Sequence, residues 1–180
     1  DPPRRRHLRD VLAWEGFGEI EPGLLAHPTI TPLEARRLLD THRLHTVAVI
    51  LEARASERAA ERRLLQRGWD LVDLAARYRR FIARFAPVSA ALARRAPEPA
   101  AAFLVRTLLI HEYRKIHLRD PLLPHPLLPR SWPGTAAYEL SRALYARVLP
   151  ASETHLARVA ARLDGPLPPP DAALFQRFGG

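Results

Sequence analysis

The residues best suited to chemistry lie in the stretch FLVRTLLIHEYRKIHLRD, residues 103–120. If this stretch is helical, the i, i+4, i+7, i+8, i+11 rule puts on one stripe Thr107, His111, Arg114, Lys115 and Leu118. Three of these side chains are basic or can become basic, they border an apolar face, and Arg119 follows at the helix end. A positive stripe beside an apolar wall suits an amphiphilic anionic ligand, such as an acyl thioester of a nucleotide. Cations at the C-terminal end of a helix, which the helix dipole favours, explain the same pattern without a ligand.

A proline-rich segment follows directly, RDPLLPHPLLPRSWPG, residues 119–134. The prolines favour extended backbone at the residues that precede them, so the leucines are expected to point in alternating directions and to fill gaps between helices. Such a segment can brace a helical bundle, and it can also line a cleft in which Trp132 offers a flat stacking surface.

The histidines do not form a recognisable metal site. His111 and His117 are six positions apart in HExxxxH, which places the two imidazoles on different faces of a helix, unlike HExxH. The chain has no cysteine, which excludes disulfides and zinc–thiolate sites. GxSxG, P-loop and GxGxxG motifs are absent from the sequence. We therefore expect neither an enzyme, nor a metal, nor a cofactor.

The composition limits the class of protein. The net charge of +9 comes almost wholly from arginine, and Lys115 is the only lysine. This charge is compatible with a partner that carries phosphates, and equally with solvated helix faces rich in arginine. No run of 18 apolar residues is present, and the first residues lack the apolar core of a signal peptide. The sequence therefore predicts a cytoplasmic protein without a membrane span.

The first part of the chain is predicted to contain both helices and strands. The pattern predicts a helix over 4–15, a hairpin turning at Glu21-Pro22-Gly23-Leu24, and a helix from 32 to about 40 after a Thr31 capping box. The β-branched run HTVAVILEA, residues 45–53, predicts a buried strand. This order matches a ferredoxin-like βαββαβ unit whose first strand would precede Asp1, so we expect a fragment of a longer protein with this middle domain over 1–55.

The remainder, residues 56–180, is predicted to be a helical domain, which makes the fold class α+β. An apolar stripe runs through residues 71–85, and a helix with a broad apolar face is expected over 99–117. A third helix should start near Thr135 and end at Pro150, with Ser152 capping a fourth.

Four stretches together resemble the PaaX family of transcriptional repressors. They are RDPLLPHPLLPRSWPGTAAYEL at 119–140, GWDLVDLAARYRRFIARF at 68–85, FLVRTLLIHEYRKI at 103–116 and RHLRDVLAWEGFGEIEPGLLAHP at 6–28. The resemblance covers nearly the whole chain, and the spacing of its proline and leucine motif is long and unusual. It implies a ferredoxin-like middle domain, similar to the small nuclease of CRISPR adaptation, and a C-terminal region.

The resemblance also implies a function. Such repressors bind operator DNA through an N-terminal winged helix, which this chain lacks, act as dimers, and are released from DNA by phenylacetyl-CoA. The chain is then expected to be the portion that senses an aryl- or acyl-CoA and forms a homodimer. On the stripe and the proline-rich segment, we place the ligand near His111, Arg114, Lys115, Arg119 and Trp132.

Two alternatives remain open at this point. The chain could be a dimerisation module without any ligand. It could also be a metal-dependent nuclease of the ferredoxin-like type, for which Asp1 is the only acidic candidate near the missing strand.

Overall fold

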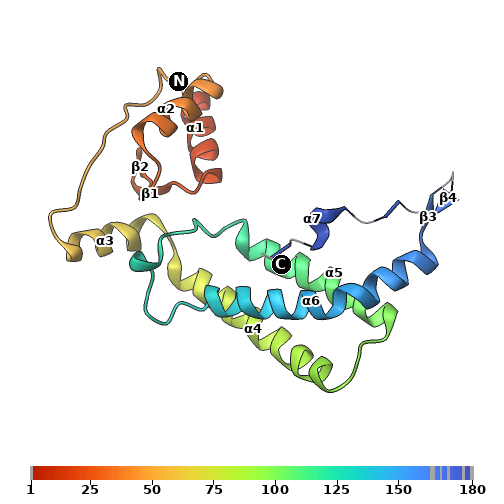
Figure 1. Cartoon of the computed structure of the whole chain (residues 1–180). Helices are drawn as coiled ribbons and strands as arrows, with labels where there is room; N and C mark the ends of the chain where they lie inside the picture. Colours follow the sequence, from red (N-terminus) through yellow and green to blue (C-terminus); the bar gives the residue numbers. More distant parts are fainter. Residues whose placement is uncertain (1, 163–164, 167, 170, 176, 179–180) are drawn as a thin grey trace. The chain divides into compact units, whose positions relative to one another are not determined.

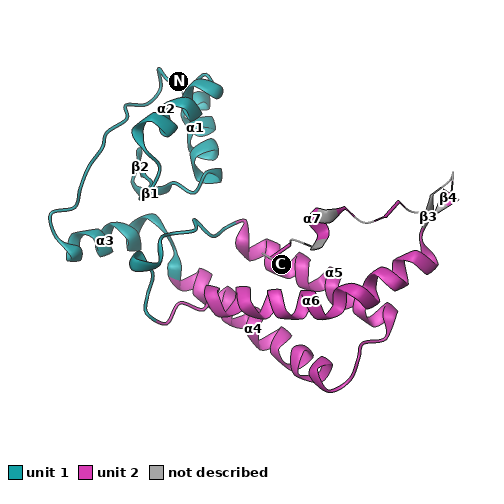
Figure 2. Ribbon diagram, viewed as in Figure 1, with its two compact units in different colours: residues 1–71, 119–130 teal, residues 72–118, 131–180 magenta. Residues whose placement is uncertain are grey.

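The computed structural model describes residues 2–162, 165–166, 168–169, 171–175 and 177–178 (Figure 1). Asp1, the candidate for the nuclease alternative, lies outside the described residues. The chain forms two compact units, shown in Figure 2: unit 1 holds residues 1–71 and 119–130, and unit 2 holds residues 72–118 and 131–180. The domain boundary expected near residue 55 stays a prediction, because compactness does not tell which segments fold on their own.

Unit 1 is built from short elements. They are α1 (Pro2–Trp14), β1 (Gly18–Glu21), β2 (Leu24–Ala26), α2 (Pro32–Thr41), α3 (Arg58–Gly68) and, in the proline-rich segment, the short 3-10 helix η1 (His125–Leu127). The helices α1 and α2 bury a small leucine core made of Leu8, Leu12, Leu39 and Leu44. The predicted turn is present, since Gly23 has a φ of 83° between the two antiparallel strands. The Thr31 capping box is confirmed as well: Thr31 Oγ1 accepts from the Glu34 amide at 3.3 Å, and the Thr31 amide donates to Glu34 Oε2 at 2.8 Å.

The ferredoxin-like prediction was wrong. Residues 45–53, the predicted strand, form neither helix nor strand, and Val49 and Leu51 are 85% and 78% exposed. Among the described residues, the sheets are two separate two-stranded pairs, so no βαββαβ unit is formed. A β-branched run becomes a strand only where a neighbouring strand accepts its hydrogen bonds, and the described part of the chain places none beside this segment. The fold is mostly helical rather than α+β.

Two glycines allow α3 to lie against the hairpin of unit 1. A Cβ on Gly18 would meet the carbonyl oxygen of Gly68 at 2.5 Å, so the backbones are in contact there. Next to this contact, Trp69 Nε1 donates to the Gly16 carbonyl at 2.9 Å. The proline-rich segment contributes to the same unit through the buried Leu123.

Unit 2 contains three long helices and small elements after them. They are α4 (Leu71–Arg94), α5 (Pro99–His117), α6 (Gly134–Val159), β3 (Ala161–Arg162), β4 (Gly165–Pro166) and α7 (Ala172–Phe175). Aromatic and aliphatic side chains from the three long helices form one core; its centre includes Tyr78, Phe81, Leu109, Leu144 and Val148. Leu109, Leu144 and Val148 have no exposed surface. The bundle predicted for the second half of the chain is therefore present in unit 2.

The prediction that Pro150 ends a helix was wrong, because α6 continues through it to Val159. A proline inside a helix removes one backbone hydrogen bond, which costs about 3 kcal/mol. Val148 and Leu149, which directly precede Pro150, are both buried. Their packing in unit 2 offsets that cost, which the local sequence alone does not reveal. The helix also begins at Gly134, with Pro133 rather than Thr135 as its N-cap residue.

The broad apolar face predicted for α5 is only partly buried. Ala102, Leu109, Tyr113 and Ile116 point into the core, whereas Leu104 and Leu108 are 57% and 46% exposed. Within the described residues, no helix has the length and apolar character needed to span a bilayer.

Candidate functional site

The candidate ligand-binding residues are carried by the second half of α5. Local signals position this helix: Pro99 occupies its first turn, and the Glu98 carboxylate accepts from the amides of Ala100 and Ala101 at 3.0 and 3.1 Å. Leu109, Tyr113 and Ile116 anchor it in the core of unit 2. These anchors fix the orientation of the helix, so that His111, Arg114 and Lys115 are exposed.

Glu112 is the centre of a small charged network on this helix. Its carboxylate accepts hydrogen bonds from Arg84 of α4 at 3.0 Å and from Lys115 at 3.1 Å, and His111 Nε2 lies 4.0 Å from its Oε1. The hydrogen bond from Lys115, followed by the charges of Lys115, Arg84 and His111, lowers the pKa of Glu112. Glu112 therefore stays ionised at neutral pH. Arg84, Lys115 and the Glu112 carboxylate together carry a formal charge of +1, because two cations face one carboxylate.

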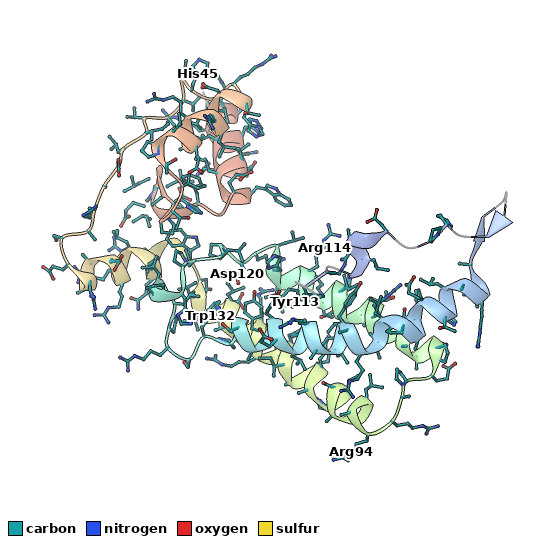
Figure 3. The ribbon with its side chains drawn as sticks, in the orientation of Figure 1. His45, Arg94, Tyr113, Arg114, Asp120 and Trp132 are labelled. Carbon is teal, nitrogen blue, oxygen red and sulfur yellow. The ribbon has the colours of Figure 1, made fainter. Side chains whose placement is uncertain are left out.

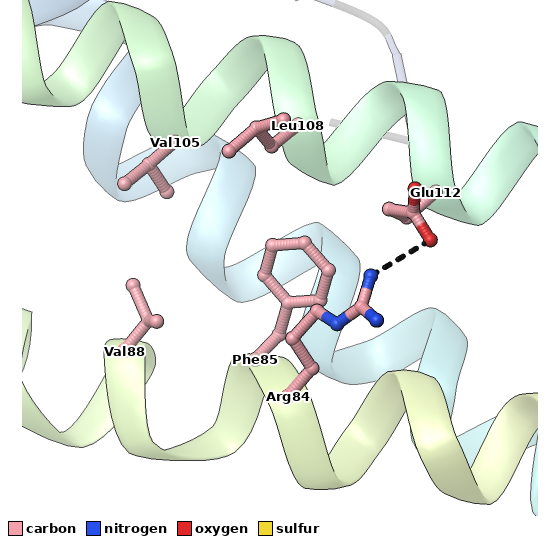
Figure 4. Close-up of a pocket in the computed structure, with 6 residues that line it drawn as sticks. All are labelled: Arg84, Phe85, Val88, Val105, Leu108 and Glu112. Atoms are coloured by element: carbon pink, nitrogen blue, oxygen red, sulfur yellow. Dashed lines mark hydrogen bonds and ion pairs between the residues drawn. The ribbon is translucent and has the colours of Figure 1, made fainter.

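An apolar hollow of about 180 Å³ opens between α4 and α5 beside this network. It is lined by Arg84, Phe85, Val88, Val105, Leu108 and Glu112. Figure 4 shows Val88 and Val105 pointing toward each other from the two helices, with the Arg84–Glu112 pair at one end. The hollow is thus apolar along its length and charged at that end.

The predicted site residues are only partly brought together. His111 and Lys115 gather around Glu112 at the rim of the hollow. Arg114 is two positions beyond Glu112, which at about 100° per residue places it almost on the opposite side of α5. Arg119 belongs to unit 1, whereas the other four belong to unit 2.

Trp132, which is labelled in Figure 3, packs against the hydrophobic core of unit 2. Its ring meets Tyr78 edge-on, with the centroids 5.8 Å apart, and a Cβ on Gly134 would lie 2.4 Å from its indole nitrogen. Gly134 therefore makes room for the indole. The half-buried ring therefore packs against Tyr78 and the first residue of α6.

Sequence reasoning missed two members of the site, Arg84 and Glu112. The sequence pattern does not single out Arg84, and it shows Glu112 only as the glutamate of the HExxxxH pattern. The hollow depends on how two helices separated by a loop pack together, which no local spacing encodes. The signal that was available is Val105, Leu108 and Glu112, which follow i, i+3, i+7 spacing on α5. Among the described residues, no group of three or more His, Asp or Glu side chains could hold a metal ion.

Comparison with known proteins decides the family. The family described as "PaaX-like protein C-terminal domain" matches residues 69–158, which include α4, α5 and nearly all of α6. A curated relative, "Transcriptional repressor PaaX" of Escherichia coli strain K12, is 38% identical over 178 residues, which cover 96% of this chain. The chain belongs to the PaaX family. The resemblance found in the sequence is thereby confirmed.

The same comparison bears on what kind of protein this is. The relative is named as a transcriptional repressor, and the expectation that the chain is not an enzyme agrees with membership of the PaaX family. The aligned region makes up 56% of the relative, so the chain spans about half the length of the PaaX repressor it matches.

Proposed function

We propose that this chain is the effector-sensing and dimerisation portion of a bacterial transcriptional repressor. The observation that carries the proposal is the 38% identity to the PaaX repressor, which extends over nearly the whole chain. Operator DNA would be bound by a winged-helix domain outside this chain, as the resemblance to the family implies. The protein would then be a regulator whose affinity for operator DNA is controlled by a ligand.

The proposed effector is an aryl- or acyl-CoA thioester, such as phenylacetyl-CoA. A CoA thioester joins an apolar acyl group to a carrier with several negative charges. Exposed cationic and imidazole side chains of α5 could bind the negative charges of such a carrier. His111 and Lys115 lie beside Glu112 at the rim of the apolar hollow, and Arg114 is exposed farther around the helix. A ligand role for Arg119 and Trp132 stays a prediction, because Arg119 belongs to unit 1 and Trp132 packs against Tyr78.

A dimerisation module without a ligand is the second candidate function. Exposed leucines favour it, since Leu104 and Leu108 of α5 and Leu118, which follows the last residue of the helix, are 57%, 46% and 54% exposed. A homodimer that covers this stripe would remove apolar surface from water. Both candidate functions include a homodimer, and they differ only in whether the chain binds an effector.

Calorimetric titration with phenylacetyl-CoA tests the proposal, with free CoA and acetyl-CoA as controls. We expect binding selective for the aryl thioester and weaker binding after Arg114→Ala, while the circular dichroism spectrum stays unchanged. Unchanged affinity in Arg114→Ala would remove this residue from the site. A dimer by sedimentation that binds no thioester would favour the dimerisation module, and a monomer that binds none would contradict both.

A further inference from the structure

The hollow between α4 and α5 has the size of one aromatic ring. Apolar cavities of about 150 Å³ lined by aliphatic and aromatic side chains stay dry and bind benzene. The hollow has a similar volume of about 180 Å³ but is partly open to solvent, and Phe85, Val88, Val105 and Leu108 supply its apolar lining. An acetyl group would leave most of this volume unfilled, whereas a phenyl ring would fill it and contact the ring of Phe85.

The charged end of the hollow points to a hydrogen-bond acceptor oxygen attached close to that ring. Arg84 uses Nη1 for Glu112, and a guanidinium carries five N–H donors, so it can hold a second acceptor at the same time. The side chains of Arg84 and Lys115 are 66% and 59% exposed. Because both cations reach water while Glu112 is only 25% exposed, a ligand oxygen can share these donors with Glu112 rather than displace it.

We propose that this hollow is the aryl subsite of the chain, with Arg84 and Lys115 as the residues that hold the acyl oxygen next to the ring. The inference rests on the proposed function and deepens it, since it assigns the aryl end of the effector to named side chains. The shared chemistry is an aromatic ring beside an acyl oxygen that accepts hydrogen bonds. A free arylacetate provides this oxygen as a carboxylate, and an aryl-CoA thioester provides it as a neutral carbonyl oxygen, with the phosphates at the far end of the pantetheine arm.

A matched pair of valines on α4 makes the test specific. Val88 lines the hollow, whereas Val72, on the same helix, is 81% exposed and does not line it. Val88→Phe fills the hollow with its own ring, and Val72→Phe makes the identical change at the surface. Calorimetry would compare both variants and the wild-type chain with phenylacetyl-CoA, phenylacetate, acetyl-CoA and free CoA.

We expect Val88→Phe to weaken phenylacetyl-CoA binding at least tenfold and Val72→Phe to change it less than twofold. Methyl resonances of Val88 and Val105 should shift in the wild-type chain on binding, because a bound ring lies over them. Aryl binding that survives Val88→Phe without methyl shifts would overturn the subsite and leave the proposed function standing. Phenylacetate binding with these shifts but no thioester binding would support the subsite and contradict the CoA effector. No binding of either aromatic ligand would overturn both.

Discussion

The buried ion pair between α5 and α6 offers the sharpest stability prediction. Arg106 is only 8% exposed although it is charged, and its guanidinium donates to the Glu153 carboxylate. It also lies 5.8 Å from the ring centroid of Phe103. Replacing Glu153 with alanine would leave a buried cation without its counter-charge.

The magnitude follows from the burial of the two partners. Breaking a fully buried pair by removing one member costs about 3–5 kcal/mol. Because the side chains are 10% and 26% exposed, water can reach the orphaned guanidinium in part. We therefore expect Glu153→Ala to lower the free energy of unfolding by about 2–3 kcal/mol, at or just below the lower end of that range.

Glu139→Ala is the matched control. Glu139 lies on the same helix and pairs with Arg142 at 3.7 Å, but both side chains are more than half exposed. Exposed pairs contribute about 0–1 kcal/mol, so this variant should stay close to the wild type. The loss of one glutamate and any change in helix propensity are then common to both variants.

Urea unfolding followed by far-ultraviolet circular dichroism measures both variants. The signal reports mainly on unit 2, which holds the three longest helices of the described chain. If Glu153→Ala is no more destabilising than Glu139→Ala, the interaction is not buried as described and the reasoning fails. The double variant Arg106→Leu, Glu153→Leu should recover most of the loss, because it leaves no orphaned charge.

Three further predictions concern other parts of the chain. Gly18→Ala places a Cβ against the Gly68 backbone and should cost about 1–3 kcal/mol, seen as a lower urea midpoint; an unchanged midpoint would mean the contact is looser. Limited trypsin digestion should cut first after Arg54, in the exposed segment between α2 and α3, which also tests the predicted boundary near residue 55; a first cut inside a helix would contradict this. The folded-state pKa of Glu112 is below its ordinary value of 4.5, so its stabilisation is present above that pH and is lost as the pH falls through the folded pKa. Glu112→Gln should therefore show a smaller loss of stability on acidification, measured by urea midpoints across this range, and an identical pH profile would refute the assigned ion pairs.

Local signals were enough to place several elements. Pro99 and the Glu98 cap define the start of α5, and the predicted range 99–117 is the observed one. The capping box at Thr31 likewise predicted α2 to within a residue or two. In both cases the relevant hydrogen bonds join residues close in the sequence, so the sequence contains all of the information needed.

The wrong predictions concern features that are determined by contacts between residues distant in the sequence. Residues 45–53 have strand propensity but no partner strand in the described structure, and α6 passes through Pro150 because residues around it are buried. The helix α3 (Arg58–Gly68) was not predicted, since its apolar pattern is weak and its position depends on the close contact between Gly18 and Gly68. The hollow between α4 and α5 is likewise a product of packing, so Arg84 and Glu112 could not be assigned to a site beforehand.

Hydrogen–deuterium exchange of the chain with and without phenylacetyl-CoA tests the central claim most directly, since it reports binding and its location together. We predict slower exchange in α4 around Arg84–Val88 and in α5 around Val105–Lys115, and a much weaker effect with acetyl-CoA. Exchange that is unchanged throughout the chain, or slowed only in unit 1, would contradict the assignment of an aryl-CoA effector to this surface.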